Sequence, residues 1–261
     1  MDKTLWALIL GASSGFGEAT ALELARLGYN IFGVHLDRRA GLAHVEEILR
    51  QIREAGREAI FLNMNAADSD KRKEVITRLQ EEFQKKPGTV RVLLHSLAFG
   101  TLVPFVGNKE AVTQQQMEMT ADVMGHSLVY WVQDLVNGGL MESGGRVFAM
   151  TSSGGRRVMP SYGPVSAAKA ILESHIRQLA MELAPRGITA NAIRAGVTDT
   201  PALRKIPGHE KLLESALQHN PHGRLTTPQD VASAIGVLAH ANTHWITGNV
   251  IGVDGGEDIV G

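Results

Sequence analysis

The chain alternates short hydrophobic runs with longer segments in which hydrophobic residues recur at helical spacing. The first run, Thr4 to Leu10, is too short for an ordinary helix and ends at Gly11, which favours a buried strand. Further runs predict strands at 29–34, 59–62, 90–94, 146–150, 188–193 and 249–253. Helical periodicity covers 18–27, 40–55, 69–86, 121–136, 162–184 and 228–240. The alternation predicts an α/β fold: a single-domain, Rossmann-type doubly wound parallel sheet of about seven strands with helices on both faces.

The pattern weakens between residues 197 and 223, where several prolines interrupt it. A short amphipathic piece, Glu210 to Gln218, lies inside this segment. Long irregular segments in compact domains often cover binding sites. We therefore expect one domain, residues 1–261, with a substrate-binding lid at about 197–223.

Composition narrows the function classes. The 26 basic and 27 acidic residues give a formal charge of −1 without a long charged run, so binding to nucleic acid or anionic membranes has no electrostatic support. The absence of cysteine excludes disulfides and thiolate chemistry, and no histidine pair at metal-ligand spacing has an acidic neighbour, so we expect no metal site. With no signal peptide and no apolar run of the ~20 residues that a membrane span needs, we expect a cytoplasmic protein.

A glycine-rich turn follows the first expected strand. Gly11, Gly15 and Gly17 form G-x-x-x-G-x-G between that strand and the first helix, where backbone and helix N-terminus suit a dinucleotide pyrophosphate. The alternative is a tight turn without a ligand. Ser13, Ser14 and Phe16 lie in the same turn; the two serines either assist phosphate binding or cap the helix.

The end of the second expected strand bears on the choice between NADH and NADPH. A carboxylate there binds a ribose diol, whereas an arginine accepts a 2′-phosphate. Asp37 falls beyond the expected strand end, and Arg38 and Arg39 follow it as a pair. We therefore favour NADPH, unless both arginines only solvate the next helix.

The strongest candidate for chemistry is a tyrosine–lysine pair. Tyr162 and Lys169 are seven residues apart, so at about 100° per residue they project from one helix face within roughly 20° of each other. A phenol beside an ammonium can stabilise or protonate an oxyanion derived from a carbonyl. The alternative is a tyrosine at a helix start and a lysine on a solvated face.

These motifs together resemble the short-chain dehydrogenase/reductase superfamily over essentially the whole chain. The common Tyr-x3-Lys pattern is broken, because Ser166 follows Tyr162 at that spacing. The Tyr-x6-Lys spacing resembles the divergent enoyl-acyl-carrier-protein reductases, and the glycine turn is similar to their third, NADPH-dependent bacterial type. Two further stretches agree: His95-Ser96-Leu97-Ala98-Phe99, and Ala195-Gly196 followed by Thr200.

The resemblance implies roles for individual residues. Tyr162 would donate to the substrate oxygen, Lys169 would hold the nicotinamide ribose, and Ser152 or Ser153 would assist. Three departures stand out: Ser152 replaces a second tyrosine of the familiar enoyl reductases, and Ala149 and Met124 replace the serine and asparagine of ordinary carbonyl reductases. His95 is a loop residue near the nicotinamide or a core histidine. The remaining residues implied to contact the cofactor are Asn65, Ser96, Gly196 and Thr200, although Asn65 can also be read as a plain turn residue. Those implied to contact the substrate are Phe99, Leu203 and Ile206.

The resemblance thus implies NADPH-dependent reduction of the double bond of trans-2-enoyl thioesters in fatty-acid synthesis. It also implies an acyl thioester substrate, carried on acyl-carrier protein, and a homotetramer. Two alternatives remain: a reductase of 3-oxoacyl thioesters or other carbonyls, and a non-catalytic NADP(H) sensor.

Overall fold

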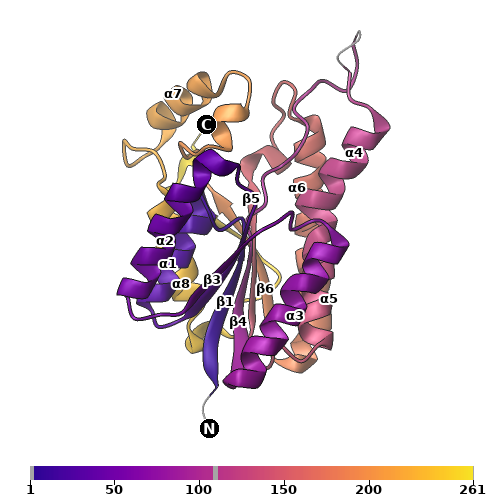
Figure 1. The fold of residues 1–261 in the computed structure, drawn as a ribbon. Coiled ribbons are helices and arrows are strands. Elements are labelled where there is room, and N and C mark those ends of the chain that lie inside the picture. Colours follow the sequence, from indigo (N-terminus) through magenta and orange to yellow (C-terminus); the bar gives the residue numbers. More distant parts are fainter. Residues whose placement is uncertain (1–2, 108–110, 261) are drawn as a thin grey trace.

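The computed structural model describes residues 3–107 and 111–260, and its centre is a seven-stranded sheet (Figure 1). All strands are parallel and their order is β3-β2-β1-β4-β5-β6-β7. The strands are β1 (Thr4–Leu10), β2 (Asn30–His35), β3 (Ala59–Asn63), β4 (Gly88–His95), β5 (Arg146–Ser152), β6 (Thr189–Ala195) and β7 (Val250–Val253). The order reverses at β1, which pairs with both β2 and β4, and this confirms the doubly wound sheet.

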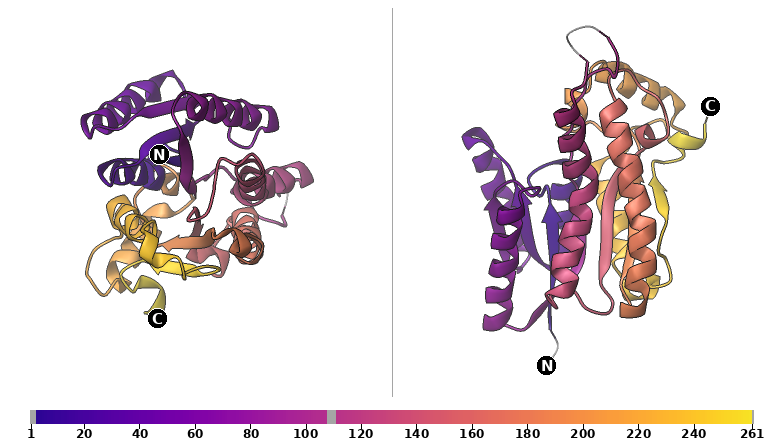
Figure 2. Two further views of the ribbon diagram at one scale, coloured as in Figure 1. Left: turned by 90° about the horizontal axis from the view of Figure 1, so that it is seen from below. Right: turned by 90° about the vertical axis from the view of Figure 1, so that its right-hand side faces the viewer.

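Helices cover both faces of the sheet (Figures 1 and 2). One face carries α1 (Gly15–Arg26), α2 (Leu42–Glu54) and α8 (Pro228–Leu238). The other carries α3 (Ser69–Lys85), α4 (Gln114–Ala121), α5 (Ser127–Asn137) and α6 (Gly163–Leu183). The remaining α-helix, α7 (His209–His219), lies beyond the carboxyl ends of the strands, on the side away from the N-terminus.

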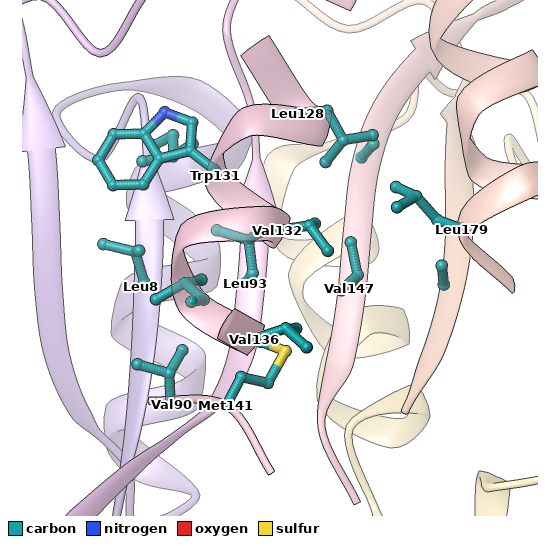
Figure 3. Close-up of a cluster of buried hydrophobic side chains, with 14 of the residues drawn as sticks. Leu8, Val90, Leu93, Leu128, Trp131, Val132, Val136, Met141, Val147 and Leu179 are labelled. Carbon is teal, nitrogen blue, oxygen red and sulfur yellow. The ribbon is translucent and has the colours of Figure 1, made fainter. Parts of the chain in front are cut away.

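Each face has its own apolar core, because strands buried on both sides present hydrophobic residues in both directions. On the α5 face, Trp131 and Leu128 belong to one buried cluster with Leu8, Leu93 and other strand residues (Figure 3). The indole N–H of Trp131 donates to the carbonyl of Ala66 at 2.9 Å, so this buried polar group is satisfied. These cores hold the strand ends in fixed positions.

The helix expected at 121–136 begins earlier than the sequence pattern indicated. Thr113 and Gln116 form a capping box that starts α4, a signal that can be read as T-x-x-Q. A π-helical turn, Asp122–His126, joins α4 to α5 in one continuous helical segment, with the Ser127 N–H donating to the Asp122 carbonyl. Such turns insert a residue into a helix and recur at functional sites.

The irregular segment contains the amphipathic helix that was expected there. The piece expected at Glu210 to Gln218 is α7, and a short 3₁₀ turn, Leu203–Lys205, precedes it. Within residues 3–107 and 111–260, no helix combines the length and apolar character that crossing a membrane requires.

Candidate active site

The glycine turn lies where the strand order reverses, between the carboxyl ends of β1 and β4. Gly11 has a φ of +89°, and a Cβ atom there would stand 2.4 Å from the carbonyl oxygen of Ser96. A Cβ atom on Gly17 would stand 2.0 Å from the carbonyl oxygen of Gly11. Both positions therefore require glycine, which explains two residues of the motif by backbone packing alone.

The open side of this turn is suited to an anion. Ser14 is the N-cap of α1, its side chain is exposed, and it makes no capping bond to the described residues. Gly15 faces Thr200, because a Cβ atom on Gly15 would lie 3.4 Å from the Thr200 methyl carbon. The N–H groups and dipole of α1 therefore begin at this turn beside Thr200, and a helix N-terminus of this kind is suited to the pyrophosphate of a dinucleotide.

Asp37 lies nearer to the glycine turn than its position in the sequence suggested. The carboxylate contacts Ser13 and pairs with His35, whose Nδ1 is 2.8 Å from Asp37 Oδ2. Burial alone would raise the pKa of Asp37, but the contacts with Ser13 and His35 outweigh it and hold this pKa below its usual range. Arg38 and Arg39 are exposed and form no ion pair with the part of the chain that the structure describes.

Asn63 holds the backbone of Asp37 in place, whereas Asn65 makes a local contact. The Asn63 side-chain oxygen accepts the Asp37 backbone N–H at 3.0 Å, and its amide donates to the Asp37 carbonyl at 2.9 Å. Asn65 accepts the Ala67 N–H at 3.0 Å, which is a local turn contact. The exposed Asn65 side chain thus behaves as a turn residue in this structure, and its expected contact with the cofactor stays a prediction.

Lys169 points into the protein, so the alternative of a lysine on a solvated face is wrong. Its side chain lies on α6, the residue is 5% exposed, and Nζ donates to the Met150 carbonyl at 2.7 Å. Burial lowers the pKa of Lys169 to about 8, and the nearby carboxylate of Glu173 opposes that effect. A titratable cation is therefore held at the carboxyl end of β5.

Tyr162 is the N-cap residue of α6 and is also buried, at 7% exposure. Burial raises the pKa of the phenol, and an interaction with the Ser152 hydroxyl partly offsets this effect. Gly154 packs on the ring, since a Cβ atom there would lie 2.5 Å from Tyr162 Cε1. The preceding Ser161 has a φ of +60°, a costly conformation that often marks functional sites.

An apolar cluster surrounds the Tyr162 ring. Tyr162 packs with the buried side chains of Met124, Val165 and Ala168, and Ile206 from the expected lid packs against the same cluster. Met124 comes from the π-helical turn, and it is the residue that the sequence comparison placed at the asparagine position of ordinary carbonyl reductases. The structure therefore brings Ile206 to Tyr162, whereas Phe99 is 61% exposed and lies outside this cluster.

His95 is a core histidine and not a loop residue. It ends β4, is fully buried, and its Nε2 is 2.8 Å from the Ser127 hydroxyl. Because that hydroxyl donates to the Val123 carbonyl at 2.8 Å, Nε2 of His95 carries the proton and donates. Burial, and secondarily the Lys169 charge, lower the pKa of His95 to about 3, so the ring is neutral.

The remaining expected residues lie around the same strand ends. Ser96 N–H donates to the Leu10 carbonyl at 2.9 Å, and Gly196 N–H donates to the Val253 carbonyl at 3.1 Å. Leu203 is half-buried beside Thr200, whose hydroxyl accepts the Leu203 N–H at 3.2 Å. No group of three histidine, aspartate or glutamate side chains is placed to hold a metal ion within the described ranges.

Sequence reasoning missed three polar residues of this region. Ser127 orients His95, Glu173 lies one helical turn beyond Lys169, and Thr151 bonds Glu173. The spacing of Lys169 and Glu173 was readable as an i, i+4 pair on one helix face. The partners of Ser127 and Thr151 depend on tertiary packing, and no local signal predicted them.

Taken together, the site joins an anion-binding turn, a buried cation and a phenol in apolar surroundings. The phenol can donate a hydrogen bond to an oxygen on which negative charge develops, and the cation favours that charge electrostatically.

Comparison with known proteins agrees with this geometry. A family model described as enoyl-(acyl carrier protein) reductase matches residues 11–257. The 1-cyclohexenylcarbonyl-CoA reductase of Streptomyces collinus is 30% identical over 263 residues, which cover 99% of this chain and 89% of that protein. The crystal structure of the NADH-dependent enoyl-acyl-carrier-protein reductase of Aquifex aeolicus superposes with a TM-score of 0.85 at 26% identity, covering 99% of this chain and 98% of that one. A promiscuous reductase that carries out keto-reduction at C1 in lugdunomycin biosynthesis superposes with a TM-score of 0.83 at 28% identity, covering 99% and 98%.

Proposed function

The chain belongs to the short-chain dehydrogenase/reductase superfamily, in the group described as enoyl-(acyl carrier protein) reductase, and from that premise we propose that it reduces the carbon–carbon double bond of trans-2-enoyl thioesters. The observation that carries this proposal is the setting of Tyr162, whose buried phenol lies in an apolar cluster with Met124. An apolar wall suits an acyl chain, and the polar relay of an ordinary carbonyl reductase is absent at Met124 and Ala149.

The residues of this chain have distinct tasks in that reaction. Reduced nicotinamide, when bound, supplies a hydride. The Tyr162 hydroxyl donates to the thioester oxygen and stabilises the negative charge that develops there. The Lys169 ammonium binds the nicotinamide ribose and adds positive charge near this oxygen. Ile206, which packs against the Tyr162 cluster, lines the acyl chain and excludes water, together with the half-buried Leu203 of the same proposed lid at 197–223.

The cofactor preference depends on opposing groups at the end of β2. Arg38 and Arg39 favour NADPH, as expected from the sequence, because they offer two cations for a 2′-phosphate. Asp37 favours NADH, because its ionised carboxylate lies beside Ser13 of the glycine turn and is 20 residues beyond Gly17. A carboxylate paired with His35 at 2.8 Å would repel a 2′-phosphate, and we therefore favour NADH over the NADPH first expected.

A direct assay tests the activity. Purified protein is incubated with NADH or NADPH and either crotonyl or acetoacetyl thioester, and oxidation of the nicotinamide is followed by absorbance. We expect turnover of the crotonyl thioester, and we expect Tyr162→Phe to retain cofactor binding while losing most of this turnover. Turnover of acetoacetyl thioester alone would overturn the proposal. Cofactor binding without any turnover would instead support the sensor.

A second candidate is reduction of a carbonyl on the same fold. It is favoured by the interaction of the Ser152 hydroxyl with Tyr162, since a hydroxyl beside the phenol can donate a second hydrogen bond to the substrate carbonyl oxygen. The acetoacetyl arm of the same assay measures this activity. Comparing crotonyl-CoA with crotonyl-acyl-carrier protein identifies the carrier, and light scattering tests the homotetramer expected from the family.

A further inference from the structure

Two side chains of α6 reach two consecutive residues at the end of β5. Lys169 Nζ donates to the carbonyl of Met150 at 2.7 Å. One helical turn later, Glu173 Oε1 accepts the hydroxyl proton of Thr151 at 2.6 Å. A cation and an anion on one helix face are thus anchored side by side to the strand that leads into the Ser152 and Tyr162 region.

The anion is enclosed as well as anchored. Thr151 is 5% exposed, and Glu173 is half-buried. The backbone of Gly155 passes over both charged residues, because a Cβ atom there would lie 3.3 Å from Lys169 Cβ and 3.5 Å from Glu173 Oε1. A half-buried carboxylate held by Thr151 has less freedom to move, and its charge is less screened by salt than that of a surface ion.

We propose that Glu173, held by Thr151, is a positioning residue that keeps the Lys169 ammonium protonated and directed toward the bound nicotinamide ribose. The carboxylate acts through Lys169 and does not touch the substrate. The inference rests on the proposed function in one respect, since Lys169 is taken to be the group that meets the cofactor. It adds a source of charge stabilisation that the tyrosine–lysine spacing alone does not provide.

The other groups near Lys169 cannot replace Glu173. His95 on β4 is neutral, and the Tyr162 phenol carries no charge near pH 7. The helical segment packed on α6 carries Asp122 and His126 in its π-helical turn. The Asp122 carboxylate is not among the charges that raise the pKa of Lys169, and His126 bonds His175, at 3.0 Å between ring nitrogens. On the loop after β5, the two arginines at 156–157 pair with Asp258. Glu173 is the carboxylate that favours the protonated form of Lys169.

The experiment measures the titration of Lys169 directly. Protein labelled with ¹³C at the lysine ε carbons is titrated from pH 6 to 11 by NMR, with the Lys169 signal assigned from Lys169→Met. In Glu173→Gln the Lys169 signal should titrate about one pH unit lower, because the variant lacks the negative charge, one helical turn from Lys169, that favours the protonated ammonium. The basic limb of the kcat/KM profile should move by the same amount, in the same direction.

Three further variants separate positioning from a general structural effect. Thr151→Val should shift the Lys169 titration in the same direction by a smaller amount, because Glu173 then loses its anchor, whereas Thr151→Ser should restore it. Glu182→Gln, at an exposed glutamate farther along α6, should leave the titration unchanged. Should Glu173→Gln fail to fold, Thr151→Val decides in its place.

The outcomes distinguish this inference from the proposed function. An unchanged Lys169 titration in Glu173→Gln overturns the positioning role, even if the protein reduces enoyl thioesters. A shifted titration supports the role even if the physiological substrate is a carbonyl, because the NMR measurement requires no substrate. The same shift in Glu182→Gln would show a non-specific effect of helix charge and would also overturn the inference.

Discussion

Lys169 is bound to Met150, nineteen positions earlier in the chain, by a 2.7 Å hydrogen bond from its ammonium to the backbone carbonyl. Lys169 is 5% exposed, so its ammonium has lost most of its hydration. A hydrogen bond to one carbonyl oxygen and the charge of a neighbouring carboxylate replace it in part. Burial of a cation is costly, and the protein tolerates this cost at the position that its proposed chemistry requires.

The first prediction concerns the pH dependence of stability at Lys169. The folded pKa of about 8 is below the ordinary lysine value of 10.5, so between these two values the unfolded chain binds a proton that the folded chain does not. The free energy of unfolding of the wild type should therefore rise over this range, relative to Lys169→Met, by up to about 3 kcal/mol. Chemical unfolding at a series of pH values measures this difference.

A control for that experiment is Lys211→Met, which changes an exposed lysine on α7. Its unfolding free energy should follow that of the wild type at every pH. Parallel curves of unfolding free energy against pH for the wild type and Lys169→Met would contradict a buried Lys169 with a lowered pKa.

The second prediction concerns His95 in acid. Its folded pKa of about 3 is below the ordinary value of 6.5, so as the pH falls from 6.5 the unfolded chain takes up a proton and the folded chain does not. The wild type should lose up to about 3 kcal/mol more stability than His95→Leu between pH 7 and pH 4. His222→Leu, at an exposed histidine, serves as the comparison, and an equal loss in all three proteins would refute a neutral, buried His95.

The fold was largely predictable because local signals agreed with the global architecture. The first strand matched its apolar run, Thr4 to Leu10, residue for residue. Strands buried on both faces read as continuous hydrophobic runs, and glycine or proline marks most of the helix ends. The start of α4 was missed because its first turn is Gln114-Gln115-Gln116, which has no apolar stripe, although the Thr113 capping box marked it.

The site was predictable in its outline and not in its polar detail. The Tyr162–Lys169 spacing and the glycine turn follow from helix geometry and backbone sterics, which act locally. The position of Asp37 beside Ser13 depends on how the loop after β2 folds back, and a count of residues along the strand does not give that path. The same holds for Glu173 with Thr151, because a bond between helix and strand depends on their relative placement.

The third prediction follows from Asp37. Asp37→Ser removes the negative charge beside Ser13 and leaves Arg38 and Arg39 in place to meet a 2′-phosphate. The ratio of NADPH to NADH affinity should therefore rise by at least about tenfold, which corresponds to about 1.4 kcal/mol. Fluorescence titration of each nucleotide measures this ratio. Asp70→Ser, at an exposed aspartate on α3, is the control, and an unchanged ratio in Asp37→Ser would exclude the carboxylate as a determinant.

The fourth prediction separates two glycines of the same turn. Gly17→Ala places a Cβ atom 2.0 Å from a backbone carbonyl oxygen, so the turn cannot keep its shape and both stability and dinucleotide binding should be lost. Gly15→Ala meets its nearest neighbour, Thr200, at 3.4 Å and adopts a φ of +55°, so it should fold with a penalty of about 1 kcal/mol. Its added methyl group still occupies the open side of the turn and should weaken nucleotide binding. Thermal unfolding without cofactor and nucleotide titration, run on both variants, measure the two effects, and tight nucleotide binding by both would remove the glycine turn from the proposed site.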